Sequence, residues 1–347
     1  MKNRVILIGA INEGNIPTCG ETMKNQLFIK RFRELFDSVI TVDTLNWQHR
    51  PWVLIKMFFS LLFNRGAKVV ISASSSASYL ISFLYYIPLK KNIYFWVVGG
   101  NLQNSVAQGR YNIKALKALK GILVQGQCMV EALNKFGLSN ILHVPNSKPI
   151  IFTPQSIEQK GTVCKFLFLS RVHPDKGVSD IISATQQLNA IGYDKQFCVD
   201  FYGKVEPSFV AEFESMIEAT PNAEYKGVLN LKDSAGYEQL SKYDMMLFPT
   251  YWDGEGFPGV VLDANMAGVP IISSDWSMNS EVVQEGYTGF IIPTRDTKAL
   301  AESMKSVIEG RVDLEQMKRN CLDWVQQYDV KNVITIELLS KIGLISR

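Results

Sequence analysis

The feature that most constrains the fold is an alternation of short apolar runs with segments of helical periodicity, which occurs twice along the chain. Each run is apolar almost throughout, which is typical of a strand whose two sheet faces are both covered by helices. The predicted strands are 4–9, 39–42, 68–72, 93–98, 122–125 and 141–144, followed by 165–170, 197–202, 223–226, 245–248, 269–273 and 289–292. Because helices separate the strands, the sequence predicts an α/β chain with two Rossmann-like, doubly wound parallel sheets.

The alternation breaks in one place, which predicts the domain organisation. Residues 145–161 contain Pro145, Pro149 and Pro154 and show little periodicity, which is typical of a connection between domains. A length of 347 residues also favours two domains over one. We therefore expect one α/β domain over residues 1–150 and a second over 151–325, facing a central cleft in which ligands of such folds bind.

Composition excludes several classes of protein. The formal net charge of +3 gives no sign of a nucleic-acid partner. Five cysteines without a C-x-x-C pair argue against a zinc site or a disulfide framework and favour the cytoplasm. No D-x-D pair or P-loop occurs, and neither half has a G-x-G-x-x-G fingerprint after its first strand, so we expect neither a metal ion nor a resident cofactor. The longest apolar stretches are too short or too interrupted to span a bilayer.

The most informative segment is 249–270, which follows the predicted strand 245–248. Glu255-Gly256-Phe257-Pro258 predicts a turn, with a helix beginning near Gly259, whose free backbone N–H groups suit an anion such as a diphosphate. Glu255 and Asp263 are eight residues apart, so both carboxylates can face one cleft and accept hydrogen bonds from sugar or ribose hydroxyls. Two ordinary solvated acids at a helix start are an equally good interpretation of the spacing alone.

This segment resembles the E-G-F-P-x-x-x-L-E-A-x-A-x-G-x-P motif of retaining glycosyltransferases of family 4, which have the GT-B fold. Matching positions are Glu255, Gly256, Phe257, Pro258, Leu262, Ala264, Ala267, Gly268 and Pro270. The second acid of the family's E-x7-E pattern is here Asp263, which keeps the charge but is one methylene shorter. The resemblance is strong over residues 165–309. It is weak over the first 150 residues, because many members of the family have a functional histidine after the fourth strand and this chain has none there.

Two further segments resemble the family. Ser170-Arg171 with Lys176-Gly177 resembles the S/G-R-x-x-x-x-K-G stretch, whose arginine and lysine hold the donor diphosphate in the family. A guanidinium fork and an ammonium point charge suit phosphate oxygens, although two solvated loop cations are the alternative for this segment by itself. Gly20 stands in a segment that resembles the family's G-G-x-E loop near the donor phosphates, with Cys19 in place of one glycine.

The resemblance implies an activity and a set of residues for it. It implies a metal-independent transfer of a sugar from a UDP- or GDP-sugar to a hydroxyl of a glycan or lipid-linked saccharide. It also implies that residues 326–347 form a helix that crosses back to the first domain. Glu255, Arg171 and Lys176 are the expected catalytic residues. Expected donor-binding residues are Gly20, Ser170, Arg171, Lys176, Gly256, Phe257, Pro258, Gly259 and Asp263.

Three alternatives stay open at this stage. A silent GT-B scaffold in a glycan assembly complex and a nucleotide-sugar epimerase are the competing functions. Residues 47–68 and 85–91 mix aromatic with basic side chains, which suits peripheral contact with the inner face of a membrane. A core helix with solvated ends is the favoured interpretation of residues 47–68.

Overall fold

The computed structural model describes residues 3–17, 19–74, 77–87, 92–158 and 161–346, and the chain divides into two compact units. Unit 1 comprises Met1–Asn146 and Val330–Arg347, and unit 2 comprises Ser147–Asp329. The predicted domain limits at residues 150 and 325 each lie four residues from these boundaries. Among the described residues, no helix is both long and apolar enough to cross a lipid bilayer.

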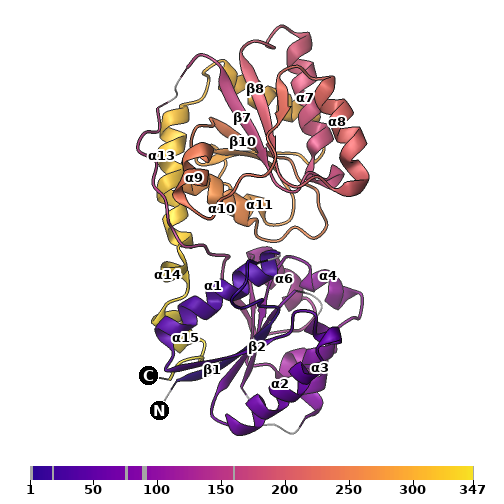
Figure 1. Cartoon of the computed structure of the whole chain (residues 1–347), viewed down its shortest axis with the longest axis vertical. Coiled ribbons are helices and arrows are strands. Elements are labelled where there is room, and N and C mark those ends of the chain that lie inside the picture. Colours follow the sequence, from indigo (N-terminus) through magenta and orange to yellow (C-terminus); the bar gives the residue numbers. More distant parts are fainter. Residues whose placement is uncertain (1–2, 18, 75–76, 88–91, 159–160, 347) are drawn as a thin grey trace. The chain divides into compact units, whose positions relative to one another are not determined.

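Unit 1 is built on a six-stranded parallel sheet in the order β2-β1-β3-β4-β5-β6 (Figure 1). Its strands are β1 (Arg4–Gly9), β2 (Ser38–Asp43), β3 (Lys68–Ala73), β4 (Ile93–Val97), β5 (Gly121–Val124) and β6 (Ile141–His143). Its helices are α1 (Gly20–Leu35), α2 (Trp52–Phe63), α3 (Ser78–Tyr86), α4 (Leu102–Ala107), α5 (Ile113–Ala118) and α6 (Gln127–Asn134), with the one-turn η1 (Trp47–His49).

The end of the chain completes one face of this sheet. Residues 330–346 contain α14 (Val330–Val333) and α15 (Ile336–Lys341), two short helices rather than one continuous helix. Leu339 and Ile345 pack into the same buried cluster as Phe28 and Phe32 of α1. In Figure 1, α1 and α15 lie on one side of the sheet, and α2 and α3 lie on the other. The C-terminal residues are therefore part of the core of unit 1.

Replacing Leu339 by alanine should test this role of the C-terminal segment. Leu339 is fully buried, so Leu339→Ala should lower the free energy of unfolding by about 2–5 kcal/mol through lost burial and a residual cavity. Ile336 in the same helix is exposed, and Ile336→Ala should change it by less than about 0.5 kcal/mol. Urea unfolding followed by circular dichroism measures both, and equal values for the two variants would contradict the packing.

Unit 2 is built on a second six-stranded parallel sheet, in the order β9-β8-β7-β10-β11-β12. Its strands are β7 (Cys164–Leu169), β8 (Phe197–Tyr202), β9 (Ala223–Tyr225), β10 (Met245–Phe248), β11 (Ile271–Ser274) and β12 (Gly289–Ile292). Its helices are α7 (Val178–Ala190), α8 (Val210–Glu218), α9 (Ser234–Leu240), α10 (Gly259–Met266), α11 (Asn279–Val282), α12 (Thr297–Ile308) and α13 (Leu314–Val325), with one-turn helices η3 (Pro174–Lys176), η4 (Pro207–Phe209) and η5 (Gln326–Tyr328). The prediction of two doubly wound parallel sheets is confirmed.

The strand order of unit 2 determines where a ligand can bind. From β7 the chain moves outward to β8 and β9, and it then returns to β10 on the other side of β7. Helices α7 and α12 cover one sheet face, whereas α10 packs against α9 and α13. In such a sheet the helices on the two sides of the reversal diverge, which leaves a crevice at the carboxyl ends of the two central strands. The residues directly after β7 and β10 therefore border this crevice.

Candidate active site

The loops that follow β7 and β10 are in direct main-chain contact. Gly177 lies between η3 and α7 with a φ of +75°, and a Cβ atom there would lie 2.3 Å from the carbonyl oxygen of Pro249. The backbone N–H of Tyr251 also donates to the carbonyl of Asp175 at 2.8 Å. Glycine is required at position 177 because both the left-handed backbone and the close approach exclude a side chain. The two segments that the sequence singles out are thus held side by side.

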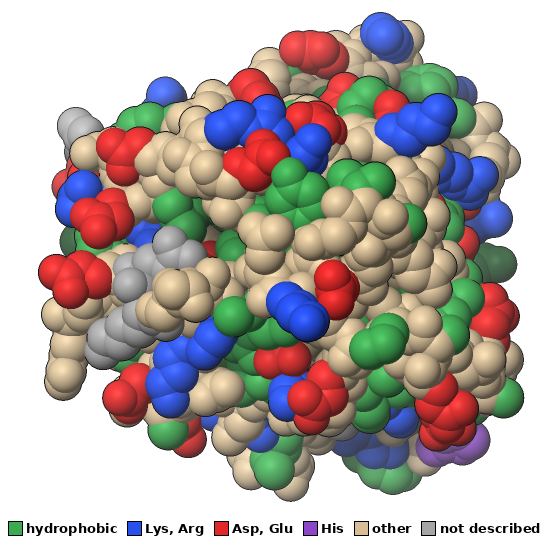
Figure 2. Space-filling view, turned by 90° about the horizontal axis from the view of Figure 1, so that it is seen from above, with side chains coloured by type: hydrophobic (Ala, Val, Ile, Leu, Met, Phe, Trp, Pro, Cys, Tyr) green, Lys and Arg blue, Asp and Glu red, His purple; other side chains and the backbone are tan. Residues whose placement is uncertain are grey.

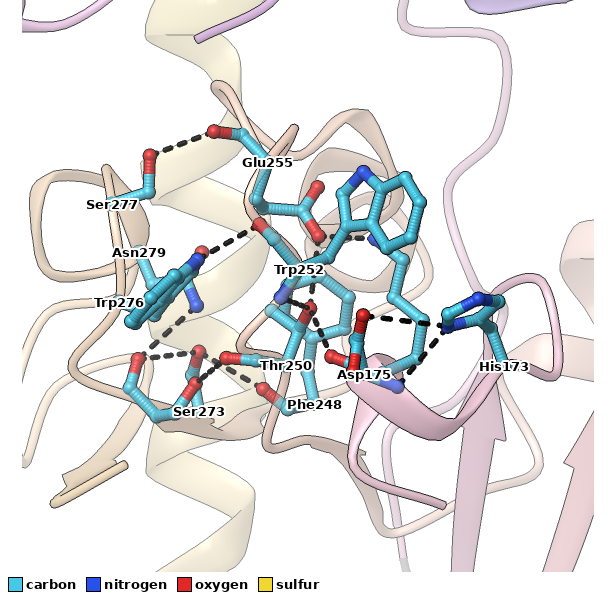
Figure 3. Close-up of polar contacts among 12 residues, drawn as sticks. His173, Asp175, Phe248, Thr250, Trp252, Glu255, Ser273, Trp276, Ser277 and Asn279 are labelled. Atoms are coloured by element: carbon cyan, nitrogen blue, oxygen red, sulfur yellow. Dashed lines mark hydrogen bonds and ion pairs between the residues drawn. The ribbon is translucent and has the colours of Figure 1, made fainter. Parts of the chain in front are cut away.

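Trp252, in the loop after β10, lies at the centre of the site (Figure 3). The guanidinium carbon of Arg171 is 4.8 Å from the centroid of its ring, and the Nζ atom of Lys176 is 5.8 Å from it. The imidazole of His173 meets the same indole edge-on, with the ring centroids 4.9 Å apart. Cations near an aromatic face are attracted by its electron density, so the indole orients both predicted phosphate-binding side chains.

Lys176, whose Nζ atom lies near this indole, forms an ion pair with Glu255. The two side chains are largely buried, with 8% and 12% of their surface exposed. The hydroxyl of Thr250, which is fully buried, donates to the same carboxylate oxygen of Glu255 over 3.1 Å. A buried carboxylate needs such partners, because desolvation is costly when a charge lacks both a counter-ion and hydrogen bonds. The carboxylate of Glu255 is therefore fixed in position by the loop after β7 and by Thr250.

The loop that carries Glu255 is also anchored through its backbone. The indole N–H of Trp276 donates to the carbonyl of Trp252 at 2.9 Å, and the hydroxyl of Ser277 donates to the carbonyl of Glu255 at 2.8 Å. Both donors follow β11, the strand next to β10 (Figure 3). Three consecutive strand ends thus contribute to one rigid group of side chains.

Helix α10 begins directly after this loop. Gly256, Phe257 and Pro258 are buried, and the ring of Phe257 packs edge-on against Tyr328 at 5.3 Å. Pro258 is the residue before the first helical position, Gly259, and no side chain caps the helix. The first N–H groups of α10 therefore carry the partial positive charge of a helix N-terminus, as the sequence predicts.

Asp263 belongs to a second polar group in the same unit. One of its carboxylate oxygens forms an ion pair with Lys148, and the other accepts a hydrogen bond from the hydroxyl of Tyr237 at 2.7 Å. Burial raises the pKa of the Tyr237 phenol, and the neighbouring carboxylate raises it further, so the phenol stays protonated and donates. Tyr237 in turn stacks on Phe152, with the ring centroids 5.8 Å apart.

The predicted residues therefore fall into three places. Arg171, Lys176 and Glu255 meet around Trp252, and Ser170 joins their loop to the sheet through its backbone N–H, which donates to Tyr202 at 3.1 Å. Asp263 pairs with Lys148 and Tyr237. Gly20 is the first residue of α1 and belongs to unit 1.

Sequence reasoning missed Trp252, Thr250 and Lys148. Trp252 and Thr250 lie within the segment 249–270, but their contacts depend on how the loop folds back on itself. Lys148 lies 115 residues from Asp263 in the chain, so no spacing could have indicated the pair.

Comparison with known proteins identifies the family. Residues 150–324 match the family described as glycosyl transferases group 1, which is half of the chain. The chain belongs to this family. A curated relative, the capsular polysaccharide biosynthesis glycosyltransferase CapM of Staphylococcus aureus, is 25% identical over 173 residues, which are 50% of this chain and 44% of CapM. The chain thus spans less than half the length of this relative.

Two solved structures share the fold over nearly the whole chain. HepE of Anabaena in complex with UDP aligns with a TM-score of 0.71 and 13% identity, covering 99% of this chain and 100% of HepE. The lipopolysaccharide outer core galactosyltransferase WaaB aligns with a TM-score of 0.72 and 14% identity, covering 99% and 100%. At these identities the likeness concerns the fold, and it confirms the predicted GT-B fold.

A double-mutant cycle on Lys176 and Glu255 should measure the buried ion pair. We expect Lys176→Met and Glu255→Gln to be coupled by about 1–3 kcal/mol in the free energy of unfolding, because either single change leaves a buried charge without its partner. The exposed pair Arg319 and Glu315 of α13 is the matched control, with an expected coupling below about 0.5 kcal/mol. Equal coupling in both cycles would show that the Lys176–Glu255 pair is not buried in solution.

Proposed function

We propose that this family member is a retaining glycosyltransferase of family 4. In this proposal it moves a sugar from a nucleoside diphosphate donor, UDP or GDP, to a hydroxyl group of a saccharide or lipid-linked saccharide during surface polysaccharide biosynthesis. The observation that carries the proposal is the cluster of Arg171, Lys176 and Glu255 around Trp252 at the strand reversal of unit 2. CapM, named for capsular polysaccharide biosynthesis, and HepE, solved with UDP, support the choice of pathway class and donor.

The difficult step of this reaction is departure of the nucleoside diphosphate. Negative charge grows on the β-phosphate as the glycosidic bond stretches, so fixed positive groups at that point lower the barrier. Arg171 offers a guanidinium fork, and Lys176 keeps two of its three N–H donors when one is used by Glu255. The N–H groups at the start of α10 add a third positive contribution. We propose that these groups take the place of a metal ion.

Glu255 has a different task in this proposal. Its carboxylate is held by Lys176 and Thr250, so it can accept hydrogen bonds from sugar hydroxyls without moving. Fixing the sugar ring aligns the anomeric carbon with both the leaving phosphate and the incoming hydroxyl. The hydroxyl attacks from the side on which the diphosphate leaves, within an ion-pair-like state, so the anomeric configuration is retained and no covalent enzyme intermediate forms.

Asp263 is assigned to the ribose of the donor. Both of its oxygens already have partners in Lys148 and Tyr237, which fix the carboxylate while leaving lone pairs for a ribose diol. The shorter aspartate side chain reaches less far from α10 than a glutamate would, and its contact with Lys148 places a third cation beside the nucleotide. Asp263 therefore contributes to donor affinity more than to the chemical step.

Removing Arg171 should test the phosphate assignment. The purified protein is incubated with UDP-, GDP- and dTDP-sugars, and products are analysed by NMR for the anomeric configuration. Arg171→Ala should lower kcat/KM for transfer by about 100-fold, as for loss of one preorganised charge at a developing anion. Arg319→Ala, at an exposed position of α13, should leave the rate unchanged.

Several outcomes would contradict the proposal. A wild-type rate in Arg171→Ala would remove the phosphate role of this residue. An inverted product would contradict retention, and conversion of the donor to an isomer without transfer would indicate an epimerase. Failure of the protein to bind any nucleotide by calorimetry would favour a silent scaffold.

Replacing Asp263 by asparagine should separate binding from chemistry. Asp263→Asn removes the charge but keeps the size, so the Kd for the nucleotide should rise about tenfold, by ~1.4 kcal/mol, through the weakened ribose contact. The value of kcat at saturating donor should change much less. Asp323→Asn, exposed on α13, is the control for a lost carboxylate. An unchanged Kd in Asp263→Asn, measured by calorimetry, would count against the ribose assignment.

A further inference from the structure

The outward face of α2 and α3 in unit 1 carries large apolar side chains in contact with water. Helix α2 buries Val53, Met57 and Leu61, which recur every four residues and form one stripe toward the sheet. The apolar face, as we name it, lies on the opposite side of α2 and on α3. It is formed by Trp52, Ile55, Phe59, Phe63, Tyr79 and Tyr86.

The exposure of this apolar face is too extensive for scattered surface residues. Trp52 is 58% exposed, Ile55 59%, Phe63 73% and Tyr86 72%. Ile55, Phe59 and Phe63 are spaced four residues apart on one side of α2, and the rings of Phe59 and Phe63 stack with centroids 5.7 Å apart, so these three side chains form a contiguous patch. Contiguous exposed patches of this kind mark contact surfaces, because isolated apolar residues are ordinary but clusters are costly in water.

Helices α2 and α3 lie side by side on the same face of the sheet (Figure 1). They connect β2 to β3 and β3 to β4, which follow one another in the same direction across the sheet. Right-handed crossovers in one direction place their helices on one side. Helix α5 packs against α3, and the amide of Asn112 donates to the hydroxyl of Tyr86 at 3.3 Å. Helix α5 therefore borders the apolar face on the side of α3.

The stretch of chain that forms the apolar face carries only positive charges. Residues 44–130 contain ten lysines and arginines and no aspartate or glutamate, although the rest of the chain has 26 cations and 33 acids. Lys56 is exposed on α2, Arg65 is exposed directly after it, and Lys114 and Lys117 are exposed on α5. Lys90 and Lys91 belong to the same stretch but lie outside the described residues. Elsewhere the charges are mixed, as in the face shown in Figure 2, where acidic and basic side chains alternate.

This charge pattern indicates which kind of partner can bind the apolar face. A second copy of the chain would bring two acid-free, cationic surfaces together, and like charges would repel. A bilayer with anionic lipids provides a partner for both kinds of side chain: an apolar boundary for the aromatic side chains and phosphates for the lysines. We propose that the apolar face docks unit 1 onto an anionic membrane surface. Trp52, Phe59 and Phe63 enter the boundary between headgroups and acyl chains, and Lys56 and Arg65 contact headgroup phosphates. The proposal does not depend on the sugar-transfer reaction.

Vesicle co-sedimentation of the purified full chain tests this docking. The wild-type protein should sediment with vesicles of phosphatidylcholine plus about 30% phosphatidylglycerol. Much less protein should sediment with vesicles of pure phosphatidylcholine. The double variant Phe59→Ser, Phe63→Ser should lose at least tenfold in the partition coefficient. Lys56→Gln should lose about fivefold, as for one basic residue at such a surface. Val228→Ser removes an exposed apolar side chain from unit 2 and should bind like the wild type.

Measurements on the same protein variants can also contradict the proposal. Circular dichroism establishes that the variants remain folded, since all substituted side chains are exposed. Absence of wild-type sedimentation with the anionic vesicles would overturn it, as would equal binding of the wild type and the Phe59→Ser, Phe63→Ser variant. Sedimentation velocity distinguishes the other occupant: a wild-type dimer that this variant converts to a monomer would assign the apolar face to a second copy instead.

Discussion

The close approach of the chain at Gly177 to the carbonyl of Pro249 holds the candidate site together. Without a side chain at position 177, the loop after β7 can lie against the loop after β10, and Tyr251 can donate to Asp175. That contact puts Lys176 within reach of Glu255, and both Lys176 and Arg171 near the ring of Trp252. The site thus depends on backbone packing at the strand reversal. The side-chain contacts can form because this packing brings the two loops together.

The polar groups of unit 2 follow one physical pattern. Each of the two acids singled out by the motif is paired with a lysine and receives a hydroxyl hydrogen bond, Glu255 from Thr250 and Asp263 from Tyr237. Pairing offsets the cost of removing these carboxylates from water and fixes their orientation before any substrate arrives. Preorganised charges of this kind are what an enzyme needs where negative charge develops, because no further reorganisation is required during the reaction.

The two units differ in where their charged and exposed apolar side chains lie. Unit 2 concentrates paired charges at the carboxyl ends of its strands, whereas unit 1 carries an acid-free stretch and an exposed apolar face over α2 and α3. The C-terminal residues 330–347 add to the core of unit 1 after the chain has completed unit 2. The core on this face of the first sheet therefore combines residues from both ends of unit 1, because Leu339 and Ile345 pack in the same cluster as Phe28 and Phe32.

The sequence by itself determined the two parallel sheets, the position of most strands, and the two segments that border the crevice of unit 2. These features are local, because runs of apolar residues and the turn residues between them act over a few neighbours. Tertiary structure alone decided that Lys148 pairs with Asp263 across 115 residues, that Arg171 and Lys176 both lie close to the ring of Trp252, and that the outward side of α2 stays uncovered. Such contacts depend on which surfaces the folded backbone brings together. A helical period in the sequence predicts which face of a helix points toward the sheet, but it does not show what covers the opposite face.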